Sequence, residues 1–507
     1  MNPLSLTGTN AAASTGWQDR LMALSSRKAA AAAQPSVQVT LGASTATDDT
    51  YAPGGQSAAE RYSNSALGAM LERNAGAASA SGLFAGLGKA LLSRLGADGS
   101  DVKLTSAAPT ATTQTGLVAP PVDTPPSDTS LSVKLTSGAS VKITLHSGED
   151  GLSIDMSSSQ SLSAEDRQSV ARLGGAFQDM LDGMSSTPPK LSLQGLTEGD
   201  SRIASVDFKA NVPTLGGAAQ TIDFHAGTDT RSVKVDGPGG KIDVAMDMRN
   251  TALWGNQNQR KAAISNYLDQ IDAATSRGQG DKKLAGLFKD AFSQLNASYP
   301  PAAATTPSDG VRNLNAKDHA VLTGLADFTA TIGQASSAPN PMHPEELDTF
   351  SYQLSQQTRL GGIGANDRTI DQQQSSHLKA SYHTAPSPGA SMQMGGKPEL
   401  QNYIYRQIDD SATTNTHMAY VKGRLVAASV TQSANQATHD KKYIMGQMVS
   451  ETTSPAQRSH TEDLLSLLDP PRKKGDDAQP PAVSQATLDR VHAMTGLVSS
   501  VGAIKAN

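Results

Sequence analysis

The sequence predicts an α+β protein in which an antiparallel meander sheet packs against helices. A largely disordered N-terminal arm precedes this sheet, and a second, polar α+β module follows it. Residues 1–129 consist mainly of Ala, Ser, Thr and Gly, which is linker composition. From about residue 130, apolar residues alternate with polar ones, as in strands with one buried face. Between and after the strand segments, apolar residues recur three and four positions apart, as they do on helices.

The arm, residues 1–129, is expected to be flexible apart from two short helices. It closes with a Pro-rich stretch and is poor in aromatic residues. The first quarter of the chain has four aromatic residues: Trp17, Tyr51, Tyr62 and Phe84. A segment with so little large apolar surface cannot offset the entropy that ordering costs.

Each of the two helices in the arm has one apolar face. The first opens at a capping box, Ser57 with Glu60, and extends to Arg73. Its apolar residues are Leu67, Met70 and Leu71. The second helix, 82–95, groups Leu83, Phe84, Leu87, Leu91 and Leu95. Because both are short and interrupted by glycine, they are either transient or they order on contact with a partner.

Residues 130–300 are predicted to form a compact α+β domain with seven strands. The first three strands form a meander whose apolar positions are Leu131, Val133 and Leu135; Val141, Ile143 and Leu145; and Leu152, Ile154 and Met156. Four more follow, with apolar positions Val206, Phe208 and Ala210; Ile222 and Phe224; Val233 and Val235; and Ile242, Val244 and Met246. The run 236–240 is the turn between the last two.

Three helices complete this domain. The first is inserted between the strands and is capped by Ser163, with Asp166 three residues later. Its apolar positions are Val170, Leu173, Phe177, Leu181 and Met184. The two trailing helices carry Ile264, Leu268 and Ile271 on one, and Leu284, Leu287, Phe288, Phe292 and Leu295 on the other. Such spacing lets each helix lie over one face of the sheet.

A less certain, Gln-rich α+β module is expected at 311–469, after a linker at 300–310. A helix from Asn315 would align Val321, Leu322, Leu325, Phe328 and Ile332. Weaker strand candidates follow at 378–382, 403–408, 417–430 and 443–449. A charged, Pro-rich linker at 470–482 leads to a C-terminal amphipathic helix, 483–507. That helix is capped by Ser484 and aligns Leu488, Val491, Met494, Val498 and Val501.

Composition excludes several classes of function. The net charge is -5 and both signs are dispersed, which gives no field for nucleic acid. No apolar run approaches the roughly 18 residues of a membrane span. The absence of cysteine removes disulfides, thiolate metal sites and cysteine nucleophiles. Residues 1–27 lack the order of a cleaved secretory signal, so a cytoplasmic location or export without such a signal is expected.

Two glycine-rich stretches fail as nucleotide-binding motifs. Residues 82–89 read GLFAGLGK, but a phosphate-binding loop needs Gly where Leu83 stands and Ser or Thr where Ala90 stands. A dinucleotide fingerprint needs a third glycine where Asp367 ends the stretch 362–367. The acidic turn 147–151 is too short to wrap calcium.

The histidines do not form a defined metal site. His377 and His383 share a face of an extended segment, with His417 and His439 as completions, but two imidazoles seldom define a zinc site. His146 and His225 fall on outward strand faces, where they need no explanation. No cofactor is expected.

Other polar groupings are also interpreted as ordinary surface. The carboxylate pairs Glu345/Glu346 and Asp409/Asp410 are adjacent, so on a strand their members point to opposite faces. Tyr403, Tyr405 and Arg406 come closest to a nucleic-acid pattern, but two tyrosines at period two more often form an apolar strand face. We therefore assign no catalytic, cofactor-binding or metal-binding residue.

The stretch from about residue 130 to 299 resembles a group of uncharacterised proteobacterial proteins. The resemblance lies in the strand 222–226, the hairpin 233–240 and the helix 284–295 with the sequence LAGLFKDAFSQL. Some members carry the label lactate dehydrogenase. The sequence has neither the nucleotide fingerprint nor the His, Arg and Asp constellation of that activity. The resemblance thus implies a fold and no catalytic residue.

Two functional hypotheses follow. The first is a non-enzymatic surface, export-linked or envelope-associated interaction protein, which docks a protein partner through the sheet's polar face or the arm's helices. The second is an enzyme whose site is assembled from distant residues near His377, His383 and Tyr403.

Overall fold

The computed structural model describes most of the chain beyond its N-terminal segment. The described residues are 66–106, 127–299, 307–470 and 483–506, except 76, 78–79, 149–150, 185, 187–189, 199 and 214–217. All of them belong to one compact unit, Ala46–Asn507. The predicted capping box of the first arm helix and most of the predicted 470–482 linker lie outside the described residues.

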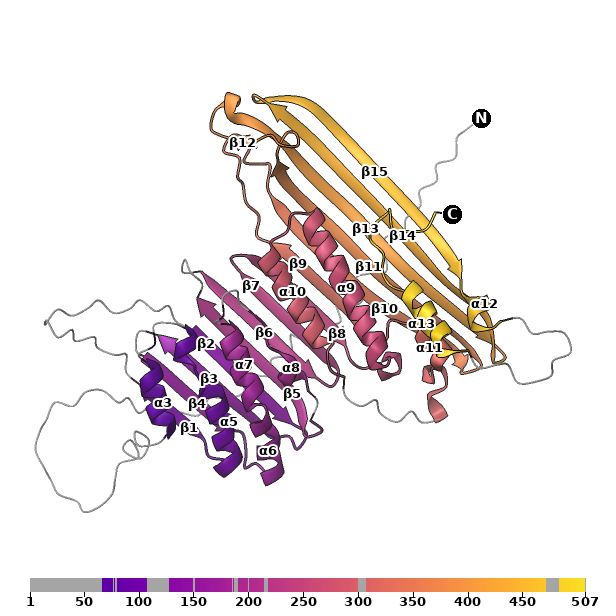
Figure 1. Cartoon of the computed structure of the whole chain (residues 1–507). Coiled ribbons are helices and arrows are strands. Elements are labelled where there is room, and N and C mark those ends of the chain that lie inside the picture. The colour runs from indigo at the N-terminus through magenta and orange to yellow at the C-terminus, as the bar shows by residue number, and fades with distance from the viewer. Residues whose placement is uncertain are drawn as a thin grey trace, which may run out of the picture. The chain divides into compact units, whose positions relative to one another are not determined.

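The described strands form a single antiparallel sheet of 15 strands (Figure 1). They are β1 (Val102–Ser106), β2 (Ser127–Leu135), β3 (Ser140–Gly148), β4 (Gly151–Ser158), β5 (Ile203–Pro213), β6 (Ala219–Gly227), β7 (Thr230–Gly237), β8 (Gly240–Asp247), β9 (Asp327–Gln334), β10 (Thr349–Gly364), β11 (Asp367–Thr384), β12 (Gln393–Met394), β13 (Gln401–Val421), β14 (Arg424–Ile444) and β15 (Gln447–Asp463). Their order is β1-β4-β3-β2-β5-β6-β7-β8-β9-β10-β11-β13-β14-β15, and β12 pairs with β13. Because β8 pairs with β9, the strands of 130–300 and of 311–469 share this sheet.

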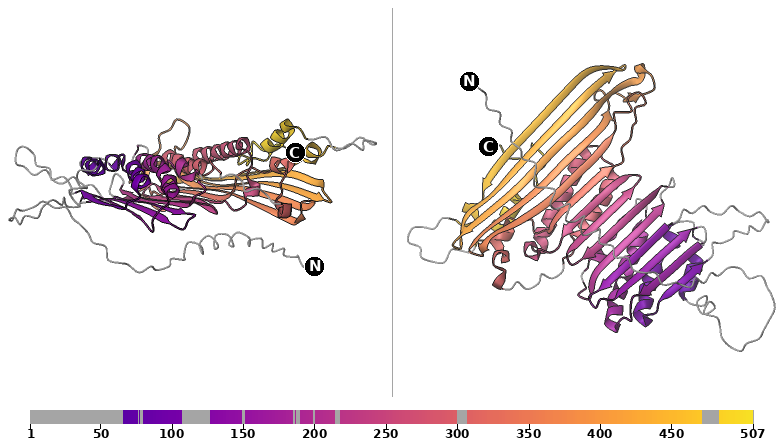
Figure 2. Two further views of the ribbon diagram at one scale, coloured as in Figure 1. Left: turned by 90° about the horizontal axis from the view of Figure 1, so that it is seen from below. Right: turned by 180° about the vertical axis from the view of Figure 1, so that it is seen from behind.

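The main helices lie along one face of the sheet, as the edge-on view of Figure 2 shows. The helical elements are α3 (Ala66–Ala75), α4 (Ala80–Leu83), α5 (Leu87–Asp98), α6 (Ala164–Arg172), α7 (Gly174–Met184), α8 (Gln194–Thr197), α9 (Gln257–Arg277), α10 (Lys282–Leu295), α11 (Ala316–Ala320), α12 (Leu465–Leu468) and α13 (Gln485–Met494), with short 3-10 turns η1 (Thr251–Leu253), η2 (Pro307–Arg312) and η3 (Pro398–Leu400). None of the described helices is both long and apolar enough to cross a membrane. The predicted antiparallel sheet with packed helices is thus confirmed, although strand dominates and α+β describes it only roughly.

The seven strands predicted between 130 and 247 are confirmed as β2 to β8. Their predicted apolar residues are buried under the helices, with Leu131, Ile143 and Phe208 fully so. The predicted turn between β7 and β8 is also present. It needs glycine, because Gly240 has φ 137 and a Cβ there would lie 2.2 Å from the Gly333 carbonyl oxygen.

The predicted inserted helix is present as two helices, α6 and α7. The Ser163 side chain accepts a hydrogen bond from the Asp166 N–H, which confirms the cap. The break falls at Leu173, before Gly174, where a Cβ would touch Lys89 and Leu92 of α5 at 3.4 Å. Glycine therefore lets α5 approach closely at the bend, and a bend at glycine is usual.

The described part of the predicted arm, 66–106, is folded, in contrast to the flexible segment expected there. The predicted second helix appears as α4 and α5. Leu87, Leu91 and Leu95 are fully buried, in contact with α6 and α7. The leucine face suggested for a partner is therefore covered by the chain itself. Sequence patterns missed this because the covering surface comes from residues about 80 positions later.

The predicted long helix from Asn315 is wrong beyond Ala320. Asn315 does cap α11 in a capping box with Asp318, as expected for a helix start. Residues 327–334, however, form β9, which fills the gap between β8 and β10. Gly324 at φ 77 precedes this strand. Every second residue of this strand is buried under the helices, namely Phe328, Ala330 and Ile332. Their spacing is that of a strand and not that of a helix.

The weaker strand candidates after residue 377 are confirmed, but as parts of much longer strands of 17 to 21 residues. Two candidates, 417–430 and 443–449, each span a hairpin turn. Those turns have positive φ at both central residues, Lys422–Gly423 and Met445–Gly446, as the strand twist favours. The strand β10 was missed altogether.

The predicted C-terminal helix ends at Met494, so Val498 and Val501 do not lie on it. Its cap is confirmed, since the Ser484 side chain accepts from the Thr487 N–H. The chain then runs beside α9, where Asn266 exchanges two hydrogen bonds with the Leu497 backbone at 3.0 and 3.1 Å.

The strand β15 is a long free edge of the described sheet and is exposed along almost its whole length. Its residue Pro455 lies opposite Ala437 of β14. The Ala437 N–H points away from β15, because it donates to the Asp410 carboxylate of β13 at 3.2 Å. The Pro455 nitrogen therefore faces the free edge, where a missing N–H weakens pairing with further strands.

Candidate functional site

The face of the sheet opposite the helices is polar and carries cross-strand ion pairs. Four histidines each contact an aspartate of a neighbouring strand: His146–Asp128 at 2.5 Å, His225–Asp207 at 2.7 Å, His377–Asp409 at 2.8 Å and His417–Asp371 at 2.7 Å. Their side chains are between one third and one half exposed. These histidines belong to a solvated strand surface, and the structure does not gather them into one site.

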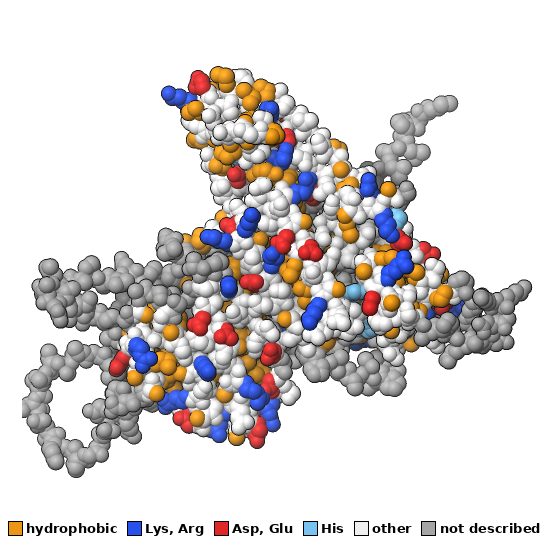
Figure 3. Space-filling model, in the orientation of Figure 1, with side chains coloured by type: hydrophobic (Ala, Val, Ile, Leu, Met, Phe, Trp, Pro, Cys, Tyr) orange, Lys and Arg blue, Asp and Glu red, His pale blue; other side chains and the backbone are white. Residues whose placement is uncertain are grey.

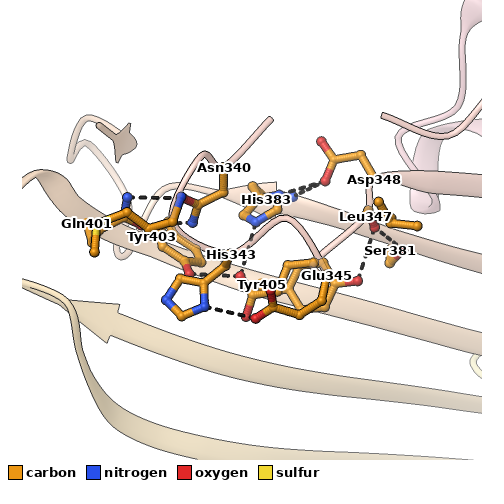
Figure 4. A network of polar contacts seen from close by, with 12 residues as sticks. Asn340, His343, Glu345, Leu347, Asp348, Ser381, His383, Gln401, Tyr403 and Tyr405 are labelled. Carbon is orange, nitrogen blue, oxygen red and sulfur yellow. Dashed lines mark hydrogen bonds and ion pairs between the residues drawn. The ribbon is translucent and has the colours of Figure 1, made fainter. Parts of the chain in front are cut away.

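The connection from β9 to β10, residues 335–348, lies across part of this polar face (Figure 4). We call it the β9–β10 loop. Its Asn340 is fully buried and forms two side-chain hydrogen bonds with Gln401 of β13, at 2.8 and 3.0 Å. The backbones of Ser337 and Asp348 bridge the two ends of the loop. The loop is therefore held both to the sheet and to itself.

Beneath the loop lies a cluster of polar side chains that we call the His383 network: Glu346, Asp348, His383 and Tyr403. The Nδ1 atom of His383 lies 2.7 Å from Asp348 Oδ1 (Figure 4). Its Nε2 atom lies 3.3 Å from Glu346 Oε2. The Tyr403 hydroxyl donates to the same Glu346 oxygen at 2.8 Å. The His383 side chain is 0% exposed, so the network is internal.

The charges in this network stabilise one another. Burial alone would lower the pKa of His383, but the hydrogen bonds and charges of Asp348 and Glu346 raise it to about 9. Burial alone would raise the pKa of Glu346, but hydrogen bonds from His383, Tyr403 and Tyr443 lower it. At neutral pH one imidazolium therefore lies between two carboxylates.

Aromatic rings surround the imidazole. Tyr403 stacks on Tyr443 of β14 with ring centroids 4.8 Å apart, and His383 lies 5.0 Å from the rings of both Tyr403 and Tyr405. The Tyr405 hydroxyl donates to the Leu347 carbonyl of the loop at 3.0 Å. The two tyrosines singled out in the sequence therefore lie beneath the loop and form hydrogen bonds with it.

The structure separates the other residues that sequence spacing had grouped. His377 pairs with Asp409 on the open surface, away from His383. Arg406 alternates with Tyr405 along β13 and pairs with Asp440 at 2.7 Å. The pattern of tyrosines and arginine therefore makes no common surface for nucleic acid.

The adjacent carboxylates separate in the same way. Glu346 is buried, whereas the Glu345 side chain is 69% exposed and pairs with His343 at 3.0 Å. Asp409 lies on the polar face, while Asp410 lies on the helix face in an ion pair with Arg277 of α9. Neither pair can divide the roles of acid and base between two neighbouring carboxylates.

The geometry of the His383 network suits anchoring rather than acid–base chemistry. Both ring nitrogens of His383 already contact carboxylates, and no face of the ring is accessible. A general acid or base must reach the proton that it transfers. Within the described residues there is also no group of three His, Asp or Glu side chains that could hold a metal ion.

A second feature lies at the same end of these strands: five large apolar side chains that remain exposed. We call them the distal surface: Met392, Leu400, Met445, Met448 and Val449, which are 44, 45, 59, 53 and 54% exposed. Figure 3 shows hydrophobic side chains gathered at this end, at the top of the view. Exposed apolar side chains that cluster mark interaction sites more often than scattered ones.

Gln401 connects the distal surface to the β9–β10 loop. Besides Asn340, its side chain donates to the Gly395 carbonyl beside β12 at 2.5 Å. Its own carbonyl accepts from the N–H of Gly446 in the β14–β15 turn at 3.1 Å. A Cβ on Gly446 would lie 3.0 Å from Pro398, so this turn packs closely. The exposed residues therefore lie at an end of the sheet that these hydrogen bonds and close contacts hold in place.

Sequence reasoning named His383 and Tyr403 but did not connect them with Glu346 and Asp348. The loop carboxylates lie 35 or more positions from His383, and no spacing rule relates them. Exposed Met448 and Val449 were part of a strand candidate, but the turn at Met445–Gly446 removes them from the core. The register of long hairpins was the missing information.

Comparison with known proteins gives no relative from which a function could be carried over: no protein-family model, curated protein or solved structure matches this chain. The glycine-rich stretch 362–367 lies at the hairpin turn between β10 and β11, and 82–89 spans α4 and the start of α5. Neither follows a parallel strand, as a nucleotide-binding turn would.

Proposed function

We propose that this chain is a non-enzymatic protein-binding scaffold that contacts a protein partner through its distal surface. The observation that carries the proposal is the gathering of Met392, Leu400, Met445, Met448 and Val449 at one end of the sheet, each about half exposed. A side chain with that exposure contributes little to the chain's own core. Contact with a partner would remove the remaining apolar area from water.

The residue types at the distal surface support a protein partner. Three of the five are methionines, whose flexible and polarizable side chains adapt to differently shaped surfaces. Charged residues Lys397 and Glu399 lie in the same segment, so the patch has a mixed rim rather than a single sign of charge. An apolar centre with a polar rim is the usual anatomy of a protein interface.

The His383 network supports the same reading by keeping this end of the sheet in one shape. Partners bind more tightly when the surface is ordered before contact, because less conformational entropy is lost. The loop, β12 and the β14–β15 turn all meet at Gln401. A braced apolar patch therefore fits docking better than it fits turnover.

The test inserts charge at the β14–β15 turn and, as a control, at the β10–β11 turn. A Met445→Lys/Met448→Lys double variant disrupts the distal surface, whereas Ile363→Lys changes a 94% exposed residue at the opposite end. Each bait, with a photo-crosslinker in place of Val449, is incubated in a lysate of the source cells and the crosslinked proteins are quantified. We expect a defined protein that crosslinks to the wild-type and Ile363→Lys baits and is lost with the double variant. Equal crosslinking by all three baits would overturn the proposal.

A further inference from the structure

A polar cavity of about 270 Å³ opens beside the His383 network. Its walls come from four separate segments: the α9–α10 turn with Gln279, the end of β9 with Gln334, the loop end with Ser337 and Asp348, and the end of β11 with Tyr382 and Thr384. The volume lies just below the roughly 300–1,000 Å³ of sites for drug-sized ligands. The cavity thus suits a small molecule.

The charge that the described lining presents to the cavity is negative. This lining contains no Lys or Arg side chain, and His383, which also lines the cavity, has a side chain that is 0% exposed. Asp348 is 28% exposed and uses only its Oδ1 atom in the hydrogen bonds from the His383 backbone and ring. Its Oδ2 atom makes no hydrogen bond to the described residues. The imidazolium of His383 is shared with buried Glu346, so one negative charge remains uncompensated.

The other groups in the lining are hydrogen-bonding and aromatic. Ser337 and Thr384 supply hydroxyls and Gln279 supplies an amide, while Tyr382 supplies an aromatic side chain. A carboxylate beside an aromatic ring is the usual combination for an alkylammonium group. The uncompensated carboxylate would repel an anion, and a purely apolar ligand would leave the polar lining without partners.

We propose that this cavity binds a small organic cation, with its ammonium group on Asp348 Oδ2 and its substituent against Tyr382. The site is separate from the distal surface and does not depend on the proposed partner. The assignment rests on the cavity, on the free carboxylate oxygen and on a described lining that exposes no cationic side chain to the cavity.

The experiment titrates the full chain with ethanolammonium, choline and putrescine chlorides, with glucose as a neutral polyol and acetate as an anion, by calorimetry at constant ionic strength. We expect at least one cation to bind with a Kd of about 1 mM or tighter, and glucose and acetate not to bind. The Asp348→Asn variant should lose about tenfold or more in affinity, because a charge-assisted hydrogen bond is removed. The Glu345→Gln variant, which changes an exposed carboxylate of the same loop, should bind as the wild type does.

A second variant keeps the test independent of the network. Ser337→Trp places a large side chain at the mouth of the cavity while Asp348 stays in place. It should abolish cation binding and leave the pH titration of the His383 ring unchanged by NMR. The proposal is overturned if no cation binds, if glucose binds as well as the cations do, or if either variant retains wild-type affinity.

Discussion

Because His383 is protonated in the folded chain, the protein should lose stability as the pH rises above neutrality. The pKa of His383 is raised from 6.5 to about 9 in the folded chain, because Asp348 and Glu346 outweigh the effect of burial. The folded state therefore holds a proton that the unfolded chain releases near pH 6.5. Its stabilisation is complete below pH 6.5 and is lost as the pH rises through about 9.

The magnitude follows from the same values. Each pKa unit corresponds to about 1.4 kcal/mol, so the raised pKa of His383 contributes no more than about 3 kcal/mol to the free energy of unfolding. Solvent screens this contribution little, because the His383 side chain is 0% exposed. Replacing His383 with Gln should cost about 3–5 kcal/mol near pH 6, since Glu346 is then buried without its cationic partner. The variant should also lose the stability change between pH 6.5 and 9.

The assay is urea unfolding followed by far-UV circular dichroism at several pH values, together with an NMR titration of the imidazole. His377→Gln is the matched control, because His377 also pairs with an aspartate but is 40% exposed. It should change the free energy of unfolding by less than about 1 kcal/mol and keep the pH dependence. A His383→Gln variant with the wild-type pH dependence would refute the reasoning, as would a ring that titrates near pH 6.5.

Three further changes test other parts of the fold. Arg368→Met should cost about 3–5 kcal/mol of unfolding free energy by urea titration, because Asp318 is fully buried against that guanidinium. Leu91→Ala should cost about 2–5 kcal/mol in the same assay, since the leucine of α5 is fully buried. Pro455→Val should produce concentration-dependent association in light scattering, because it restores an N–H to the free edge of β15.

Each of these changes has its own control. Lys317→Met removes a partly exposed ion pair with Asp469 and should cost no more than about 1 kcal/mol. If Leu91→Ala left stability unchanged, α5 would not be part of the core. Thr453→Val adds apolar area to the same edge without adding an N–H, so association equal to that of Pro455→Val would exclude the backbone explanation.

The strands from β2 to β8 could be predicted because each buries one face, so that polar and apolar residues alternate. The strand β10 begins with the same alternation, since Phe350, Tyr352 and Leu354 are buried, so its first half could have been predicted. Its buried face becomes polar only in its second half. Gln356 of β10 and Gln374 of β11 are almost fully buried and accept hydrogen bonds from the Tyr267 hydroxyl of α9 at 3.2 and 3.1 Å. A buried amide is tolerated only where such partners exist. The sequence does not show that a tyrosine about 90 positions away supplies them.

The candidate site was predictable only in part for the same reason. The tyrosines at 403 and 405 were interpreted as a strand face, and they do form one. Tyr403 faces a loop carboxylate and Tyr405 a loop carbonyl because of where the β9–β10 loop crosses the sheet. This crossing follows from the pairings of β9, which the helix predicted over 315–332 leaves out. The wrong helix prediction over 315–332 therefore also prevented the prediction of the His383 network.

The long strands at the C-terminal end also explain why the exposed methionines point to a partner. Near the turn that joins them, β14 and β15 carry mainly polar side chains and are held by cross-strand pairs such as His439–Glu451 and Lys441–Glu451. Strands stabilised in this way need no apolar residue at the turn that joins them. Met445 and Met448 nevertheless flank that turn, half exposed and beside a braced loop. Because folding does not require them there, their exposure supports the proposed contact with a protein partner.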